Sequence, residues 1–206
     1  MNRYLEGVTK DIVESQGYLY DEMSPMIIDM KVVEKSEKDS MRMIIKEKSG
    51  KEKNIDGLDN ITTFIDELKF RYKQQRYDKT YLKMAKEWSN LSYCTRLKVG
   101  ALIVKDDMII SDGYNGSPTG FDNQCELNPD ETHWYVLHGE ANAILKCARR
   151  GQSCDGATLY LTHSPCKECS KLILQAGIKR LVYSDEYRDN KGVDFLKQTG
   201  VEVLKY

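Results

Sequence analysis

The strongest constraint on how this chain folds comes from two short segments that carry metal-binding side chains. Residues 138–140 read His-Gly-Glu, and residues 165–169 read Pro-Cys-Lys-Glu-Cys. The two cysteines lie one helical turn apart, so one ion can contact both thiolates. Imidazole and thiolate are ligands that Zn²⁺ prefers, and three protein ligands leave the fourth tetrahedral position to water. The fold is therefore expected to bring His138, Cys166 and Cys169 to one catalytic zinc ion.

Glu140 distinguishes a catalytic site from a purely structural one. It follows His138 by two residues, where its carboxylate could reach a water at the open position without binding the metal. Two other interpretations of the cysteines exist: a redox pair, or half of a closed structural zinc site with His163 as the fourth ligand. Neither needs the distant His-x-Glu element, which favours the catalytic interpretation. His163 would then line the site.

Composition narrows the class of protein. The chain has 206 residues and a formal net charge of -1, which argues against a general nucleic-acid binder. No apolar stretch approaches the length of a membrane span, and residues 1–15 lack the apolar core of a signal peptide. Two of the six cysteines belong to the zinc motif, so we expect no disulfide framework and a cytoplasmic location.

The sequence divides into an N-terminal appendage, residues 1–76, and a second domain, residues 77–206. The appendage is polar and carries no chemical motif. Apolar alternation over 25–34 and 41–48 predicts a β-hairpin, and helical spacing over 60–76 predicts a helix. Its role is not evident from the sequence; an accessory or oligomer-forming function and a regulatory or partner-binding function both remain open.

The second domain alternates helix and strand patterns. Helices are expected at 78–92, 138–149, 166–176 and 190–199, and strands at 99–104, 108–113, 157–162, 180–184 and 201–204. This order predicts an α/β sandwich on one mixed sheet, with parallel crossovers in its strand-helix-strand portions. Both metal-binding segments then fall at helix N-termini, where the helix dipole favours thiolates.

Five stretches of this domain resemble the cytidine and deoxycytidylate deaminase superfamily, most closely its deoxycytidylate (dCMP) deaminase branch. They are residues 94–101, 113–118, 138–144, 160–169 and 175–183. The resemblance implies a cytidine deaminase-like α/β/α sandwich on a mixed five-stranded sheet. It also implies one catalytic Zn²⁺ per chain, Glu140 as the proton carrier, and hydrolysis of dCMP to dUMP and ammonia, which would feed thymidylate synthesis. Gly139 stands where the family usually has alanine.

Two residues are expected to bind the substrate. The resemblance implies that Asn115, in the Gly-Tyr-Asn-Gly-Ser-Pro loop, contacts the nucleotide; the alternative is an ordinary turn residue, because Asn-Gly is a common turn pair. Arg96 is the expected phosphate contact, since a guanidinium fork suits phosphate oxygens. A solvated surface arginine is the alternative.

The resemblance also implies properties beyond the catalytic site. These are a homo-oligomer, a hexamer by family likeness, with dCTP as activator and dTTP as inhibitor. A second, structural zinc on Cys94, Cys125 and His133 is a further hypothesis; the alternative is two buried thiols and a surface histidine.

Three other functions remain open. A polynucleotide deaminase, such as a tRNA adenosine editor, shares the zinc chemistry but needs a basic surface, and nucleic acid is therefore not an expected partner. A deaminase of another cytosine nucleotide or nucleoside would carry the same motifs. A zinc-stabilised binding module would have no use for Glu140.

Overall fold

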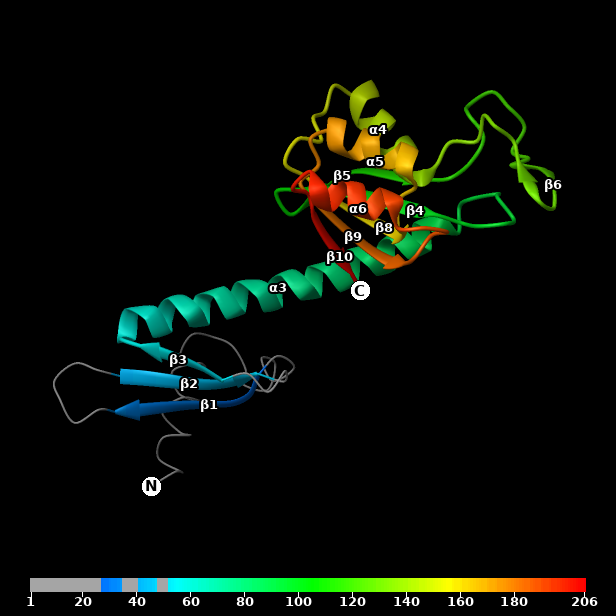
Figure 1. Cartoon of the computed structure of the whole chain (residues 1–206). Helices are drawn as coiled ribbons and strands as arrows, with labels where there is room; N and C mark the ends of the chain where they lie inside the picture. The colour runs from blue at the N-terminus through cyan, green and yellow to red at the C-terminus, as the bar shows by residue number, and fades with distance from the viewer. Residues whose placement is uncertain (1–26, 35–40, 48–51) are drawn as a thin grey trace. The chain divides into compact units, whose positions relative to one another are not determined.

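The computed structural model describes residues 27–34, 41–47 and 52–206 of the chain (Figure 1). Two compact units are present, Met1–Arg76 and Tyr77–Tyr206. In the first unit, β1 (Ile27–Glu34) pairs antiparallel with β2 (Met41–Glu47), as the alternating pattern predicts. A third strand, β3 (Glu52–Asp56), pairs with β2. It was not predicted, because its sequence Glu-Lys-Asn-Ile-Asp shows no apolar alternation.

One helix, α3 (Leu58–Ser89), replaces the two helices that we expected at 60–76 and 78–92. The helix runs without interruption because its sequence contains neither glycine nor proline, the residues that most readily end a helix. In the first unit it buries Ile61, Phe64 and Ile65, and in the second unit it buries Leu82 and Ala85. The boundary between the units is therefore crossed by continuous helix.

The second unit is built on a mixed five-stranded sheet in the order β10-β9-β8-β4-β5, which confirms the predicted fold class. Strands β8, β9 and β10 are parallel, and β4 is antiparallel to both β8 and β5. Asp106 and Asp107, with φ of 51° and 60°, make the predicted tight turn between β4 and β5. The strands span Gly100–Lys105 (β4), Met108–Tyr114 (β5), Thr158–His163 (β8), Arg180–Asp185 (β9) and Glu202–Lys205 (β10).

Helices cover both faces of this sheet (Figure 1). Helices α4 (Gly139–Arg149), α5 (Lys167–Gln175) and α6 (Lys191–Gln198) lie on one face. Ala143, Ile173 and Leu196, one from each helix, are fully buried there against Ile103 and Leu161 of the sheet. Since neighbouring residues of a strand face opposite sides, Leu102 and Tyr160 pack on the other face against Leu82 and Ala85 of α3. The result is the expected α/β/α sandwich.

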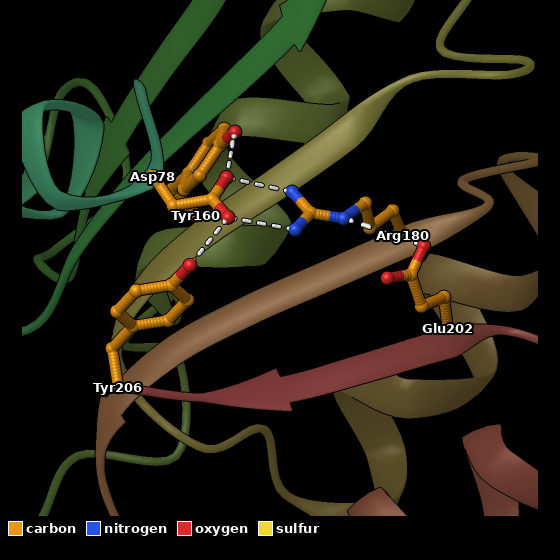
Figure 2. Close-up of polar contacts among 5 residues, drawn as sticks. All are labelled: Asp78, Tyr160, Arg180, Glu202 and Tyr206. Carbon is orange, nitrogen blue, oxygen red and sulfur yellow. Dashed lines mark hydrogen bonds and ion pairs between the residues drawn. The ribbon is translucent and has the colours of Figure 1, made fainter. Parts of the chain in front are cut away.

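A buried ion pair fixes α3 to this second face (Figure 2). Asp78 of α3 accepts two hydrogen bonds of 2.7 Å from the Arg180 guanidinium. The hydroxyl groups of Tyr160 and Tyr206 donate to the same carboxylate at 2.8 and 3.0 Å. Glu202 lies 3.4 Å from the Arg180 Nε. Residues far apart in the sequence thus share one carboxylate, which joins α3 to β8, β9 and the last residue of the chain.

An insertion separates β5 from α4. Gly116 and Leu137 exchange backbone hydrogen bonds of 3.0 Å across its base. Within it, β6 (Glu126–Asn128) and β7 (Glu131–Thr132) form a short ribbon that the sequence analysis did not predict. The Sγ atoms of Cys94 and Cys125 lie 2.22 Å apart in a disulfide. Our expectation that the cysteines would be free was wrong for this pair, because the fold brings the insertion against the loop before β4.

Candidate zinc-dependent active site

The three proposed metal ligands lie at the N-termini of two helices, as predicted. His138 is the N-cap of α4, and Cys166 is the N-cap of α5. Both have extended backbone, with ψ of 156° and 165°, and neither caps its helix with its own side chain. Cys169 lies in the first turn of α5. Because the first turns of a helix present free N–H groups, both ends favour negative charge at the site.

The distances among these side chains fit one zinc ion. The Nδ1 atom of His138 lies 3.6 Å from the Cys166 Sγ and 3.3 Å from the Cys169 Sγ, and all three ligand atoms lie within 4.8 Å of one another. Zinc bonds of ~2.0 Å to nitrogen and ~2.3 Å to sulfur at tetrahedral angles would separate nitrogen and sulfur by roughly 3.5 Å. The imidazole would therefore bind through Nδ1.

The thiol groups of Cys166 and Cys169 shift each other's pKa in opposite directions. Hydrogen bonding to Cys169, helped by His138, lowers the pKa of Cys166 to about 3 against the opposing effect of burial. The same pairing, together with burial and the nearby Glu140, raises the pKa of Cys169. The hydrogen bond to Cys166 raises the pKa of His138, although burial opposes it. One thiolate forms readily here, and a cation is needed to hold two so close together.

Glu140 lies in the same cavity as the ligand group. It is 4% exposed and belongs to the first turn of α4. Burial raises the pKa of its carboxyl group, while His138, a backbone N–H and the Cys169 thiol act in the opposite direction. A buried carboxyl with a raised pKa beside a cavity is suited to both accepting and donating a proton.

The cavity extends from the ligand group to the loop before β4. Besides His138, Glu140 and Cys166, it is lined by Leu97, Val99, Asn115, His163, Ser164 and Tyr187. The sequence analysis identified Asn115 and His163 but missed the others. Ser164 and Tyr187 follow the carboxyl ends of the parallel strands β8 and β9. Ligands commonly bind at these ends in α/β sheets, so this position could have indicated both residues from the sequence.

Asn115 lines the cavity, and its side chain also forms hydrogen bonds with the backbone. Its Oδ1 accepts a 2.8 Å hydrogen bond from the N–H of Val99, and its Nδ2 donates at 2.7 Å to the carbonyl of Leu97. It does not sit in a two-residue hairpin turn, because β5 ends at Tyr114 and the chain continues into the insertion. Its side chain thus holds the cavity-lining residues Leu97 and Val99 in place.

Arg96 is placed beside the cavity rather than in it. Its backbone N–H and that of Thr95 donate to one carboxylate oxygen of Glu126 at 3.2 and 2.9 Å. Its Nη1 donates to the Thr132 hydroxyl at 3.2 Å. The residue is exposed, and the next residue in the sequence, Leu97, lines the cavity.

The residues of the hypothetical second metal site are only partly brought together. Cys94 and Cys125 are joined in the disulfide, and the backbone N–H of His133 donates to the Cys125 carbonyl at 2.9 Å. The His133 ring, however, stacks on Tyr135 with 4.8 Å between centroids. A structural zinc at these residues stays a prediction, and it requires the two sulfurs to be reduced.

Known proteins resemble this chain over the same region. A family profile described as the cytidine and deoxycytidylate deaminase zinc-binding region matches residues 75–185. The deoxycytidylate deaminase of Enterobacteria phage T4 is 38% identical over 168 residues, covering 61% of this chain and 87% of the phage enzyme. The deoxycytidylate deaminase of Saccharomyces cerevisiae is 31% identical and covers 80% of this chain, which spans 57% of the yeast enzyme.

A solved structure agrees in fold as well as sequence. The dCMP deaminase of cyanophage S-TIM5, in complex with dCMP and dUMP, is 48% identical with a TM-score of 0.62. The match covers 64% of this chain and 97% of the cyanophage chain. The residues that the family profile matches, 75–185, contain the His138, Glu140, Cys166 and Cys169 segments. The chain therefore belongs to the cytidine and deoxycytidylate deaminase family, through that family's zinc-binding region.

Proposed function

We propose that this chain is a zinc-dependent nucleotide deaminase that hydrolyses dCMP to dUMP and ammonia. The observation that carries the proposal is a His/Cys/Cys group at zinc-binding distances, two of whose members, His138 and Cys166, line one cavity with the buried carboxyl group of Glu140. The choice of dCMP is supported by the T4, yeast and cyanophage relatives, the last of which holds dCMP and dUMP in its crystal structure.

The roles of the site residues follow from their chemistry. His138, Cys166 and Cys169 would hold Zn²⁺, whose Lewis acidity makes a water molecule nucleophilic near neutral pH. Glu140 would accept the proton that this water loses as its oxygen bonds to the amine-bearing carbon. The same carboxyl group would deliver that proton to the ring nitrogen. It would then take the remaining proton from the newly added hydroxyl group and give it to the amine, so that ammonia leaves as the carbon–nitrogen bond breaks and the carbonyl forms.

Asn115 and Arg96 are our proposed nucleotide contacts. The second Nδ2 hydrogen of Asn115 remains available to a sugar hydroxyl or base edge after the bond to Leu97 is made. Arg96 supplies a cation for the phosphate at the loop that lines the cavity. Its hydrogen bond to Thr132 is a weak neutral-acceptor contact that a phosphate oxygen would displace.

The proposal is tested by supplying dCMP, deoxycytidine and cytidine to the purified chain and measuring ammonia release. We expect dCMP to be the preferred substrate. A clear preference for an unphosphorylated nucleoside would replace dCMP by another cytosine compound. If the chain instead bound tRNA tightly in a salt-sensitive manner and deaminated adenosine, the substrate would be a polynucleotide and not dCMP.

Assembly and regulation are further proposals that rest on family likeness. We propose a homo-oligomer, a hexamer, that dCTP activates and dTTP inhibits. Light scattering gives the oligomer size, and activity at low dCMP concentration with each effector gives the response. A monomeric chain indifferent to both nucleotides would contradict this proposal.

A separate proposal concerns where the protein is located. Among the described residues, none of the helices has an apolar stretch that could span a lipid bilayer. We propose a cytoplasmic protein, and cell fractionation tests this. In a reducing cytoplasm Cys94 and Cys125 would be present as thiols, so the state of the Cys94–Cys125 disulfide in cells also tests this proposal.

A further inference from the structure

His163 lines the proposed active-site cavity, yet neither metal binding nor proton transfer uses it. It is the last residue of β8, it is half-buried, and it shares the cavity with Glu140 and Asn115. Its ring does not belong to the group of ligand atoms formed by His138, Cys166 and Cys169. A polar ring in this position is available to contact the substrate.

The neighbouring Thr162 fixes which nitrogen of this ring carries the hydrogen. The Thr162 side chain is buried, at 1% exposure, and its Oγ1 accepts a 3.1 Å hydrogen bond from the N–H of Gly100. The same oxygen lies 3.1 Å from the Nδ1 of His163. A hydroxyl group has one hydrogen to donate. In the described part of the chain, Nδ1 is the acceptor that this hydrogen can reach.

If Nδ1 carried the hydrogen instead, the Thr162 hydroxyl would accept two bonds and its own hydrogen would be buried without an acceptor, which is costly. The satisfied arrangement therefore leaves Nδ1 unprotonated and places the hydrogen on Nε2. Burial and Lys86 lower the pKa of His163, although Asp185 opposes them, so the ring is neutral at neutral pH. His163 thus carries one hydrogen-bond donor of fixed position.

We propose that the Nε2–H of His163 donates to the ring carbonyl of an aminopyrimidinone and makes this chain specific for cytosine-type bases. This inference rests on the proposed function. In cytosine the ring nitrogen that Glu140 would protonate is flanked by the C2 carbonyl oxygen, an acceptor. In adenine the corresponding nitrogen is flanked by a C–H group, which accepts nothing. A fixed donor that lines the same cavity as Glu140 therefore favours an aminopyrimidinone over an aminopurine.

The experiment compares dCMP with its 2-thio analogue, in which sulfur, a weak acceptor, replaces the carbonyl oxygen. We expect the wild-type chain to prefer dCMP clearly. His163→Leu should lower kcat/KM for dCMP by roughly 10- to 100-fold, the effect of leaving a buried acceptor unpaired. It should change kcat/KM for the thio analogue by less than about 3-fold. The preference for the oxygen compound would then nearly disappear.

Two further variants distinguish loss of the His163 hydrogen bond from a general disturbance of the cavity. His163→Gln places an amide N–H near the original Nε2 and should restore part of the preference for dCMP. Tyr187→Phe removes another polar group that lines the cavity and should leave the ratio of the two substrates unchanged. A loss of preference in Tyr187→Phe but not in His163→Leu would overturn the proposal, as would an equal loss on both substrates in His163→Leu.

The tautomer itself can be observed without activity. In ¹⁵N NMR spectra of the zinc-loaded chain, whose three histidines can be assigned by substitution, His163 should show a protonated Nε2 and an unprotonated Nδ1. A protonated Nδ1 would overturn the proposal even if His163→Leu does not fold. A wild-type chain that ignores dCMP altogether would instead refute the proposed function, so the two failures are distinguishable.

Discussion

The side chains of the site are placed by short backbone elements, and this explains which of them could be predicted. His138, Cys166 and Cys169 belong to two local motifs whose ligand chemistry is evident without the fold. Arg96 is different. Its guanidinium contacts Thr132, a residue of the insertion, and no local pattern shows that contact. Contacts between distant segments depend on packing that the sequence does not display.

Removal of the proton-carrying group should abolish turnover without removing the metal. Glu140→Gln keeps the size of the buried side chain but cannot shuttle protons, so kcat should fall by roughly 10²- to 10⁴-fold while zinc content is unchanged. The matched control is Glu168→Gln, an exposed carboxylate beside Cys169 that pairs with Lys171. Undiminished kcat in Glu140→Gln would remove this residue from the mechanism.

Loss of the phosphate contact should affect nucleotides alone. Arg96→Ala should raise KM for dCMP by roughly 10-fold, the effect of losing a charge-assisted hydrogen bond, and leave deoxycytidine turnover unchanged. Steady-state kinetics on both compounds measure this. The control is Arg188→Ala, whose exposed guanidinium lies over the Tyr187 ring, 5.4 Å from its centroid. A larger rise in KM for dCMP in Arg188→Ala than in Arg96→Ala would indicate that the phosphate binds at the Tyr187 end of the cavity.

At the scale of elements, the sequence predicts the strands and helices of the second unit to within a few residues. Apolar runs and helical spacing are local signals, and they mark β4, β5, β8 and the three helices of one face. The two helices predicted at 60–76 and 78–92 are one continuous helix, α3, and the ribbon of β6 and β7 was not predicted. Helix α3 is continuous because no glycine or proline interrupts it. The ribbon is held in place by the Cys94–Cys125 disulfide and by the hydrogen bond that Glu126 accepts from Thr95, and its own sequence shows no strand pattern.

Close approach of α4 to the sheet requires glycine at the end of β5. A Cβ atom on Gly113 would lie 2.1 Å from the carbonyl oxygen of Gly139, in the first turn of α4. Gly113→Ala should therefore destabilise the fold by about 1–3 kcal/mol or more and weaken zinc retention by displacing His138. Urea denaturation and a zinc assay measure both effects. Gly116→Ala is the control, because nothing lies within 4 Å of its added Cβ.

Removal of one partner from the buried ion pair of α3 should strongly destabilise the second unit (Figure 2). Asp78→Ala leaves the Arg180 guanidinium, whose side chain is 14% exposed, without its carboxylate, so the free energy of unfolding should fall by about 3–5 kcal/mol. Glu186→Ala breaks the exposed pair with Lys205, which solvent screens, and should have a far smaller effect. If urea denaturation gave similar losses in the free energy of unfolding for the two variants, removal of Asp78 from its pair with Arg180 would not have the destabilising effect predicted.

At the scale of the whole molecule, the family likeness and the chemistry fall in the same part of the chain. The family profile covers residues 75–185, and the cavity is lined from Leu97 to Tyr187. The strands β1 to β3 lie outside that region, and the sequence predicted their hairpin but no role. We propose residues 1–76 as an accessory appendage and 77–206 as the deaminase domain.

The central claim is that one zinc ion held by His138, Cys166 and Cys169 supports deamination of dCMP. The most direct measurement follows dUMP formation from dCMP by the whole chain before zinc removal, after chelation, and after zinc is restored. Turnover should disappear with the metal and return when one zinc per chain is bound. Turnover that persists after the zinc has gone, or none from a chain that holds it, would contradict the account.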